Sequence, residues 1–320
     1  MFGLHLPVPV TAGAGFLFAW PGSAGLVPDV IAPLLLATRP KTLPAAIVPV
    51  WVGCVLAWKL TGKFSLPLAL ATVGGAVFIQ IATNLFNDAI DAAKGADTER
   101  RLGPQRVTAS GLLSRTAVMT AAAVFLGLAI ACGVVLYQAA GWPILAIGIP
   151  SLYLAYGYTG GPFPLAYRGM GELFVILFFG LVAVCGTVFV QTLEWRKEAL
   201  LLGAQVGLLS AALISINNLR DREEDSTTGK RTFAVRFGSK PARVIIWMEI
   251  KLAAFLGLIW FIFELPWQVL ASFPMLSLGM RLSWGALTMP EDRGMNRLLA
   301  MAAGQLVAFA VLFHFFAVKL

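Results

Sequence analysis

Apolar stretches of about 20 residues recur along this chain, and they constrain its fold more than any other feature. A helix of that length spans the hydrocarbon core of a bilayer, which is about 30 Å thick. Charged residues make up only 12% of the 320 residues, against about 25% in soluble domains. We therefore expect an all-α, polytopic membrane protein with nine transmembrane helices, near residues 42–60, 67–90, 115–138, 143–158, 171–190, 198–218, 243–263, 267–286 and 297–317.

Basic residues gather on one side of these predicted spans. The outer loops contain only Lys59, Lys63, Arg196, Lys197 and Lys319. Loops rich in Lys and Arg generally stay in the cytoplasm, so we expect a multi-pass protein of the inner (cytoplasmic) membrane whose active site faces the cytoplasm. The net charge of +8 arises from short loops between apolar runs, which does not favour a nucleic-acid partner.

Residues 1–30 precede the first predicted span, and their prolines and glycines interrupt every apolar run. They also lack the basic region with which a signal peptide begins. We expect an N-terminal extension over residues 1–30 rather than a tenth span, followed by a single transmembrane domain over residues 31–320.

Side chains that carry oxygen ligands gather at the inner ends of two predicted helices. On the second helix, Asn84, Asp88 and Asp91 lie at positions i, i+4 and i+7, and Asn87 lies one turn before Asp91. These spacings place the side chains on one face of a helix. The sixth helix repeats the pattern with Asn217, Asn218, Asp221 and Asp225. The two clusters can therefore oppose each other.

An ionised Asp in a bilayer costs about 2.5–3.5 kcal/mol on insertion scales, so a cation has to compensate these acids. Only two histidines are present, both near the termini, so the available ligands are hard oxygens, which indicate magnesium. Proteins commonly share magnesium with substrate phosphates. The pattern therefore predicts a Mg²⁺-diphosphate site, and solvated acids at helix ends are the alternative.

The inner loops also provide cations and aromatic rings. Arg and Lys that can contact diphosphate oxygens are Lys94, Arg106, Lys230, Arg231, Arg39 and Lys41. Topology signalling or lipid contact is an alternative for each of them. The faces of Tyr158 and Tyr167 can stabilise an allylic cation by about 0.5–2 kcal/mol, or anchor the chain at the interface. Glu172 begins a predicted span and either complements the helix N-terminus or contacts substrate.

These segments resemble the UbiA superfamily of intramembrane aromatic prenyltransferases over nearly the whole chain after residue 30. Within it, five segments look like the 1,4-dihydroxy-2-naphthoate polyprenyltransferases (MenA type). They are Asn87-Asp88-x-x-Asp91-x-x-Lys94-Gly95-x-Asp97, Gly103-Pro104-x-Arg106-Val107-Thr108-x-Ser110-Gly111, Tyr158-Thr159-Gly160-Gly161-Pro162, Tyr167-Arg168-Gly169-x-Gly171-Glu172 and Gly229-Lys230-Arg231-Thr232. Ala89-Ile90 departs from the aromatic residues that relatives commonly carry there. The resemblance implies nine helices around a central cavity.

The resemblance also implies a Mg²⁺-dependent prenyltransferase that joins a polyprenyl diphosphate to 1,4-dihydroxy-2-naphthoate with decarboxylation, giving demethylmenaquinone for menaquinone biosynthesis. The candidate catalytic residues are Asp88, Asp91, Asp221, Asp225 and Tyr158, and the four acids are the candidate metal ligands. The candidate substrate-binding residues are Asn84, Asn87, Lys94, Asp97, Arg106, Tyr167, Glu172, Asn217, Asn218, Lys230, Arg231, Arg39 and Lys41. Asp97 binds metal or orients the acceptor in this interpretation.

Three other functions compete with this one. A prenyltransferase for another aromatic acceptor, such as 4-hydroxybenzoate, fits the same motifs, because acceptor choice depends on the shape of the cavity. A cation-coupled transporter also uses paired acids, but these lie near the bilayer midplane rather than beside basic loops at one face. A CDP-alcohol phosphatidyltransferase is disfavoured because the chain has no D-G-x-x-A-R run.

Overall fold

The structure is a computed structural model that describes residues 30–96 and 102–319. The expected N-terminal extension, apart from Val30, and the candidate Asp97 lie outside the described residues. Every regular element within the described ranges is helical, which confirms the all-α fold class.

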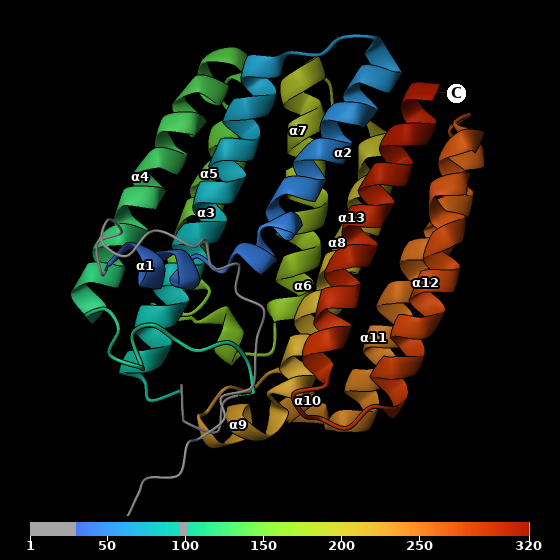
Figure 1. Cartoon of the computed structure of the whole chain (residues 1–320). Coiled ribbons are helices and arrows are strands. Elements are labelled where there is room, and N and C mark those ends of the chain that lie inside the picture. The colour runs from blue at the N-terminus through green and yellow to red at the C-terminus, as the bar shows by residue number, and fades with distance from the viewer. Residues whose placement is uncertain (1–29, 97–101, 320) are drawn as a thin grey trace, which may run out of the picture.

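Long helices form a bundle in which neighbouring helices run side by side (Figure 1). They are α2 (Pro44–Thr61), α3 (Leu66–Ala93), α4 (Arg115–Ala140), α5 (Pro143–Gly157), α8 (Lys197–Arg220), α11 (Ser239–Phe255), α12 (Val269–Thr288) and α13 (Met295–Lys319). One further helix is continuous through α6 (Gly171–Val175), the π-helical η3 (Ile176–Val182) and α7 (Ala183–Thr192). The short helices are α1 (Ile31–Ala37), α9 (Arg222–Thr227), α10 (Phe233–Phe237), η1 (Pro40–Thr42), η2 (Leu165–Tyr167), η4 (Leu256–Phe261) and η5 (Pro266–Gln268).

Each of the nine expected spans coincides with a helix of the bundle. Seven helices in the described part of the chain are long and apolar enough to cross a membrane, which confirms a polytopic membrane protein. The other two expected spans, 143–158 and 267–286, correspond to α5 and α12. Helix α5 is apolar but has only 15 residues, and α12 is not among the seven. The expected number of nine membrane-crossing helices is therefore not confirmed.

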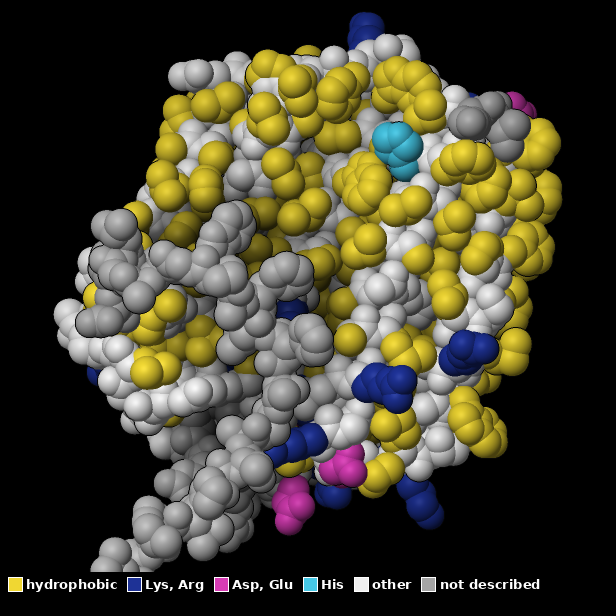
Figure 2. All heavy atoms as spheres, in the orientation of Figure 1, with side chains coloured by type: hydrophobic (Ala, Val, Ile, Leu, Met, Phe, Trp, Pro, Cys, Tyr) yellow, Lys and Arg dark blue, Asp and Glu magenta, His cyan; other side chains and the backbone are white. Residues whose placement is uncertain are grey.

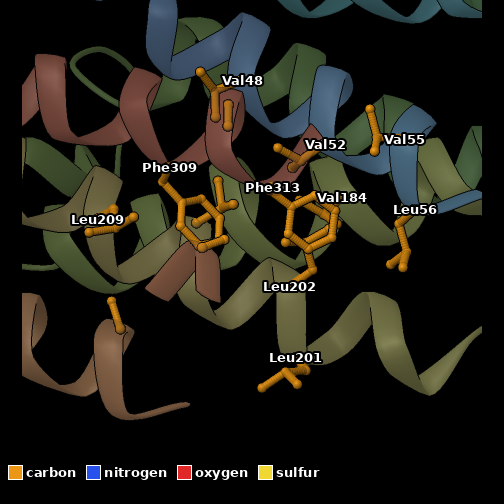
Figure 3. Close-up of a cluster of buried hydrophobic side chains, with 14 of the residues drawn as sticks. Val48, Val52, Val55, Leu56, Val184, Leu201, Leu202, Leu209, Phe309 and Phe313 are labelled. Atoms are coloured by element: carbon orange, nitrogen blue, oxygen red, sulfur yellow. The ribbon is translucent and has the colours of Figure 1, made fainter. Parts of the chain in front are cut away.

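The core of the bundle lies where α2, α7, α8 and α13 meet. Apolar side chains from these helices interlock there, among them Val52, Leu202, Phe309 and Phe313, all at most 1% exposed (Figure 3). Because lipid is as apolar as these side chains, helices in a membrane associate through close packing rather than through the hydrophobic effect. This packing fixes α8, whose inner end carries the second acidic motif.

Close backbone contact joins η3 to α8. A Cβ atom added to Gly180 would lie 2.4 Å from the carbonyl oxygen of Gly203 and 2.6 Å from the Cα of Gly207. Only glycines allow this approach, as small residues do at other membrane helix interfaces. The α6–η3–α7 helix is thereby held against α8, which brings Glu172 close to Asn218.

Alternation of helix direction places both acidic motifs at the same end of the bundle. Helices α3 and α8 finish at this end, where α9 and α10 lie, whereas the C-terminus lies at the opposite end (Figure 1). On the face shown in Figure 2, hydrophobic side chains cover most of the height of the bundle, and Lys, Arg, Asp and Glu gather mainly toward the α9–α10 end. The polar chemistry is therefore concentrated at one end of an apolar bundle.

Candidate active site

Four segments of the chain meet at Asp91, near the inner end of α3. This residue is 2% exposed. Its Oδ1 accepts a hydrogen bond from the Tyr167 hydroxyl at 2.8 Å. Its Oδ2 accepts from Lys230 Nζ at 2.8 Å and from Arg106 Nη2 at 3.2 Å. A buried carboxylate requires such compensation, so the loops that carry these three donors are tied to α3 through one side chain.

Asp88 holds the loop over residues 102–114 and is 1% exposed. Its Oδ2 accepts a hydrogen bond from the Val107 amide at 3.1 Å, and its Oδ1 accepts from the Thr108 amide at 2.8 Å. Hydrogen bonds from backbone amides to a carboxylate are charge-assisted and stronger than neutral ones. Asp88 therefore positions the loop from which Arg106 reaches the site.

The segment that joins α5 to α6 covers the same face of α3. The Thr159 hydroxyl donates a hydrogen bond to Asn87 Oδ1, and the Thr159 carbonyl accepts from Lys94 Nζ at 2.8 Å. The Lys94 ammonium also lies 4.0 Å from the centroid of the Tyr167 ring. Burial lowers the pKa of Lys94 below its ordinary value. Its positive charge is thus held by neutral partners next to the acids.

Asn84 fixes the turn that precedes α2. Its Nδ2 donates hydrogen bonds to the Thr38 carbonyl at 2.9 Å and to the Thr42 hydroxyl at 3.0 Å. Arg39 lies inside this turn in a left-handed conformation, with φ of 52°, and Lys41 is exposed. The amide of Asn84 therefore serves to attach the two predicted cations to the first acidic helix.

The second acidic motif is organised by an arginine. Arg220 is 2% exposed and binds the Asp221 carboxylate through Nε at 2.7 Å and Nη2 at 2.6 Å. The same guanidinium donates to Asn217 Oδ1 at 2.9 Å and to Asn296 Oδ1 at 2.6 Å. Asn296 in turn donates to the Leu102 carbonyl at 3.2 Å. This chain of hydrogen bonds connects Asp221 to the loop that Asp88 anchors.

The turn after α9 joins the two motifs. The Lys230 amide donates to the Asp225 carbonyl at 3.1 Å, while the Lys230 ammonium binds Asp91. The next amide, that of Arg231, donates to the Tyr167 carbonyl at 3.3 Å, and the Arg231 side chain is exposed. Lys230 therefore spans from the second motif to the central acid of the first.

Tyr158 lies among acids from both motifs. Burial raises the pKa of its phenol well above the ordinary value, and the charges of Glu172, Asp91 and Asp225 raise it further. Glu172 also accepts a hydrogen bond from Asn218 Nδ2 at 2.8 Å. The phenol is therefore neutral over the physiological range, with its proton in place.

An apolar cavity of about 240 Å³ extends from Tyr158 into the bundle. Its walls come from α2, α3, α4, α5 and the α6–η3–α7 helix. Gln80 and Thr83 provide polar groups in this wall, whereas Phe174 and Phe178 provide aromatic rings. A cavity of this kind accepts an apolar chain whose polar end lies at the tyrosine.

The donor set suits a magnesium ion that is shared with a ligand. No group of three or more His, Cys, Asp or Glu side chains that could hold a metal is found among the described residues. The four motif acids nevertheless offer hard carboxylate oxygens, and Asn87 and Asn217 add amide oxygens. Because magnesium is commonly held by one or two carboxylates plus substrate phosphates, this set fits a Mg²⁺-diphosphate complex better than a metal bound by protein alone.

The structure adds three residues to those predicted from sequence: Thr159, Arg220 and Asn296. Arg220 directly precedes a candidate metal ligand, which is a signal that sequence reasoning can use. Thr159 and Asn296 lie 72 and 76 residues from Asn87 and Arg220, the partners they bind. Their contacts depend on the packing of helices, so no local spacing indicates them.

Comparison with known proteins places this site in a family. A model described as the UbiA prenyltransferase family matches residues 46–317. The 1,4-dihydroxy-2-naphthoate octaprenyltransferase of Bacillus subtilis (strain 168) is 38% identical over 210 residues, which cover 65% of this chain and 67% of that protein. The protein of the same name from Mycobacterium tuberculosis (strain ATCC 25618 / H37Rv) is 36% identical, over 72% of this chain and 78% of its own length.

A solved structure shows the same fold. The UbiA homolog from Archaeoglobus fulgidus bound to GPP and Mg²⁺ superposes with a TM-score of 0.66 at 16% identity, and the match covers 90% of this chain and 100% of that one. At this identity the likeness concerns the fold alone. The match to the family model covers far more than half of the sequence. The chain therefore belongs to the UbiA prenyltransferase family.

Proposed function

We propose that this prenyltransferase moves a polyprenyl group from polyprenyl diphosphate to 1,4-dihydroxy-2-naphthoate, with decarboxylation, in menaquinone biosynthesis. The observation that carries the proposal is the convergence of Asp91, Lys230, Arg106 and Tyr158 beside an apolar cavity. Such a site matches a substrate with an anionic head and an apolar tail. The names of the two bacterial relatives support the choice of acceptor.

The donor set supports magnesium dependence as part of the proposal. Asp88 and Asp91 on α3, with Asp221 and Asp225 after α8, are the residues that would hold the ion. When bound, magnesium would supply Lewis-acid stabilisation of the leaving diphosphate, worth several kcal/mol. Because Arg106 and Lys230 already contact Asp91, the same side chains are within reach of oxygens bound to that acid.

The cationic side chains act on the diphosphate. Arg106 provides a planar guanidinium suited to bidentate contact, and Lys94 and Lys230 provide point charges. Three further cations add positive charge around the diphosphate: Arg39, Lys41 and Arg231. Charge that develops on the leaving diphosphate as the allylic carbon–oxygen bond breaks is thereby stabilised.

Aromatic and acidic side chains act on the other half of the reaction. The ring faces of Tyr158 and Tyr167 stabilise the allylic cation that remains after the bond breaks. A ring carbon of the naphthoate then attacks the cation; the carboxylate leaves as carbon dioxide, and the electron pair of the broken bond stays in the ring. Glu172, held by Asn218, and Asn217 orient the groups around this step.

The membrane side of the site is part of this proposal. The basic ends of the helices support a location at the cytoplasmic face of the inner membrane. A lateral opening between helices would let the prenyl tail stay in lipid while its head enters the site. The remaining alternative is the transfer of the same group to another aromatic acid such as 4-hydroxybenzoate, because the shape of the apolar cavity alone does not select the ring.

Membranes that contain Asp88→Ala or Asp221→Ala test the proposal. We expect both variants to lose magnesium-dependent prenyl transfer at unchanged expression, and Glu223→Ala, an exposed acid of the same segment, to keep it. Retention of activity in both Asp variants would overturn the site. Offering purified enzyme 1,4-dihydroxy-2-naphthoate and 4-hydroxybenzoate with one prenyl diphosphate tests the acceptor, and preference for the second acid would overturn that assignment.

A further inference from the structure

Thr159 joins two groups of the first motif that lie two turns apart on α3. It is 1% exposed. Its hydroxyl donates to Asn87 Oδ1 and its carbonyl accepts from Lys94 Nζ. Residues 87, 91 and 94 follow the i, i+4, i+7 spacing of one helix face, so Thr159 lies across the face that carries Asp91.

These contacts form a closed ring that includes the central acid, Asp91. From Thr159 the ring passes through Lys94 to the face of Tyr167, whose hydroxyl binds Asp91. It returns along α3 to Asn87. A ring of this kind leaves each member little freedom to turn, because moving one side chain breaks the contact of the next.

The hydroxyl determines how the Asn87 amide is oriented. An asparagine can present either its oxygen or its NH₂ group to a given direction, and a donor at Oδ1 selects one of the two. Because Oδ1 faces the hydroxyl, the NH₂ group points away from Thr159. Without the hydroxyl, the two orientations of the amide become similar in energy.

The backbone carbonyl of Thr159 holds the Lys94 ammonium in place. A carbonyl and an aromatic face are neutral partners, so they hold the ammonium without cancelling its charge, unlike the carboxylate that binds Lys230. Lys94 therefore remains available to an anion at the site. This second contact is made by backbone and is kept in any variant of the Thr159 side chain.

We infer that Thr159 is a positioning residue of the diphosphate site, which acts by orienting the Asn87 amide toward the bound metal-diphosphate complex. This inference rests on the proposed function for the identity of the ligand. It predicts that the hydroxyl, rather than the volume of the side chain, is what the site requires.

Purified full-length variants test this inference by calorimetric titration with magnesium pyrophosphate and by steady-state kinetics. Thr159→Val keeps the shape and removes the hydroxyl; we expect about tenfold weaker pyrophosphate binding, as for one lost buried hydrogen bond. The KM for prenyl diphosphate rises by the same factor, and the KM for the aromatic acceptor is unchanged. Thr159→Ser restores most of the affinity. Thr288→Val, which removes an exposed hydroxyl at the inner end of α12, serves as the matched control.

A double-mutant cycle tests the route through Asn87. In an Asn87→Ala background we expect Thr159→Val to have no further effect on pyrophosphate binding. Additive losses, unchanged binding in Thr159→Val, or a loss in Thr159→Ser as large as in Thr159→Val would each overturn the inference. Thr159→Ala replaces Thr159→Val if the latter does not fold. If wild-type enzyme fails to prenylate the naphthoate while these binding differences persist, the acceptor assignment fails and the role of Thr159 stands.

Discussion

Replacement of Asp91 by Asn separates charge from shape at the centre of the site. In the wild-type chain one carboxylate oxygen of Asp91 binds Lys230 at 2.8 Å and Arg106 at 3.2 Å. The side chain of Asp91 is 3% exposed, that of Lys230 is 13% exposed and that of Arg106 is 6% exposed. The variant keeps one acceptor oxygen but loses the negative charge. Two nearly buried cations then lose the carboxylate that they share.

The expected magnitude follows from these two contacts. A hydrogen bond to a charged group contributes about 1.5–3 kcal/mol, so the pair accounts for about 3–6 kcal/mol. Removing one partner of a buried ion pair costs about 3–5 kcal/mol in measured cases. At about 1.4 kcal/mol for each factor of ten, a transition-state loss of this size lowers kcat/KM by about 10²- to 10⁴-fold.

Two assays on detergent-purified protein check this reasoning: thermal unfolding, and prenyl transfer at saturating magnesium. Asp91→Asn should unfold at a lower temperature than wild type and lose activity. Adding Lys230→Met to Asp91→Asn removes the ammonium that lost its carboxylate, so the double variant should regain part of the thermal stability but none of the activity. Wild-type stability in Asp91→Asn, or activity regained in the double variant, would refute the argument.

Two further predictions concern neighbouring side chains. Asp88→Asn places an NH₂ group against one of the two backbone amides that the carboxylate binds, which costs about 1.5–3 kcal/mol. The loop over residues 102–114 should therefore be cut faster by trypsin in this variant than in the control variant Glu223→Ala. Equal cleavage rates would contradict the anchoring role of Asp88. Burial lowers the pKa of Lys94. The negative charge of Asp91 raises this pKa, and the positive charge of Lys230 lowers it further. Pyrophosphate affinity should therefore fall as pH rises through that lowered pKa, and titrations from about pH 7 to about pH 10 should show no such fall in Lys94→Arg.

Periodic features of this protein could be predicted from its sequence because they depend on neighbours along the chain. The apolar runs locate the long helices of the bundle in the described part of the chain, since helix formation in lipid depends on local composition and length. The spacing of Asn87, Asp88 and Asp91 likewise places them at one helix end, and the alternation of spans puts Asp221 and Asp225 on the same side of the membrane.

Partners of these acids could not be predicted in the same way. Asp88 and Asp91 look equivalent in the motif, yet one binds two backbone amides and the other binds Lys230, Arg106 and Tyr167. Both sets of donors come from distant segments. Their positions depend on how loops settle over the packed helix ends.

The sequence by itself determined the membrane-embedded helical fold, the positions of the acids on their helices and the basic character of one face. Only the tertiary structure decided that Thr159 binds Asn87, that Arg220 binds Asn296, and that Tyr158 lies among acids of both motifs. The physical reason is the separation of the partners along the chain. Hydropathy and helix periodicity depend on residues that are close in sequence, whereas a hydrogen bond between distant segments forms only after the helices between them have packed.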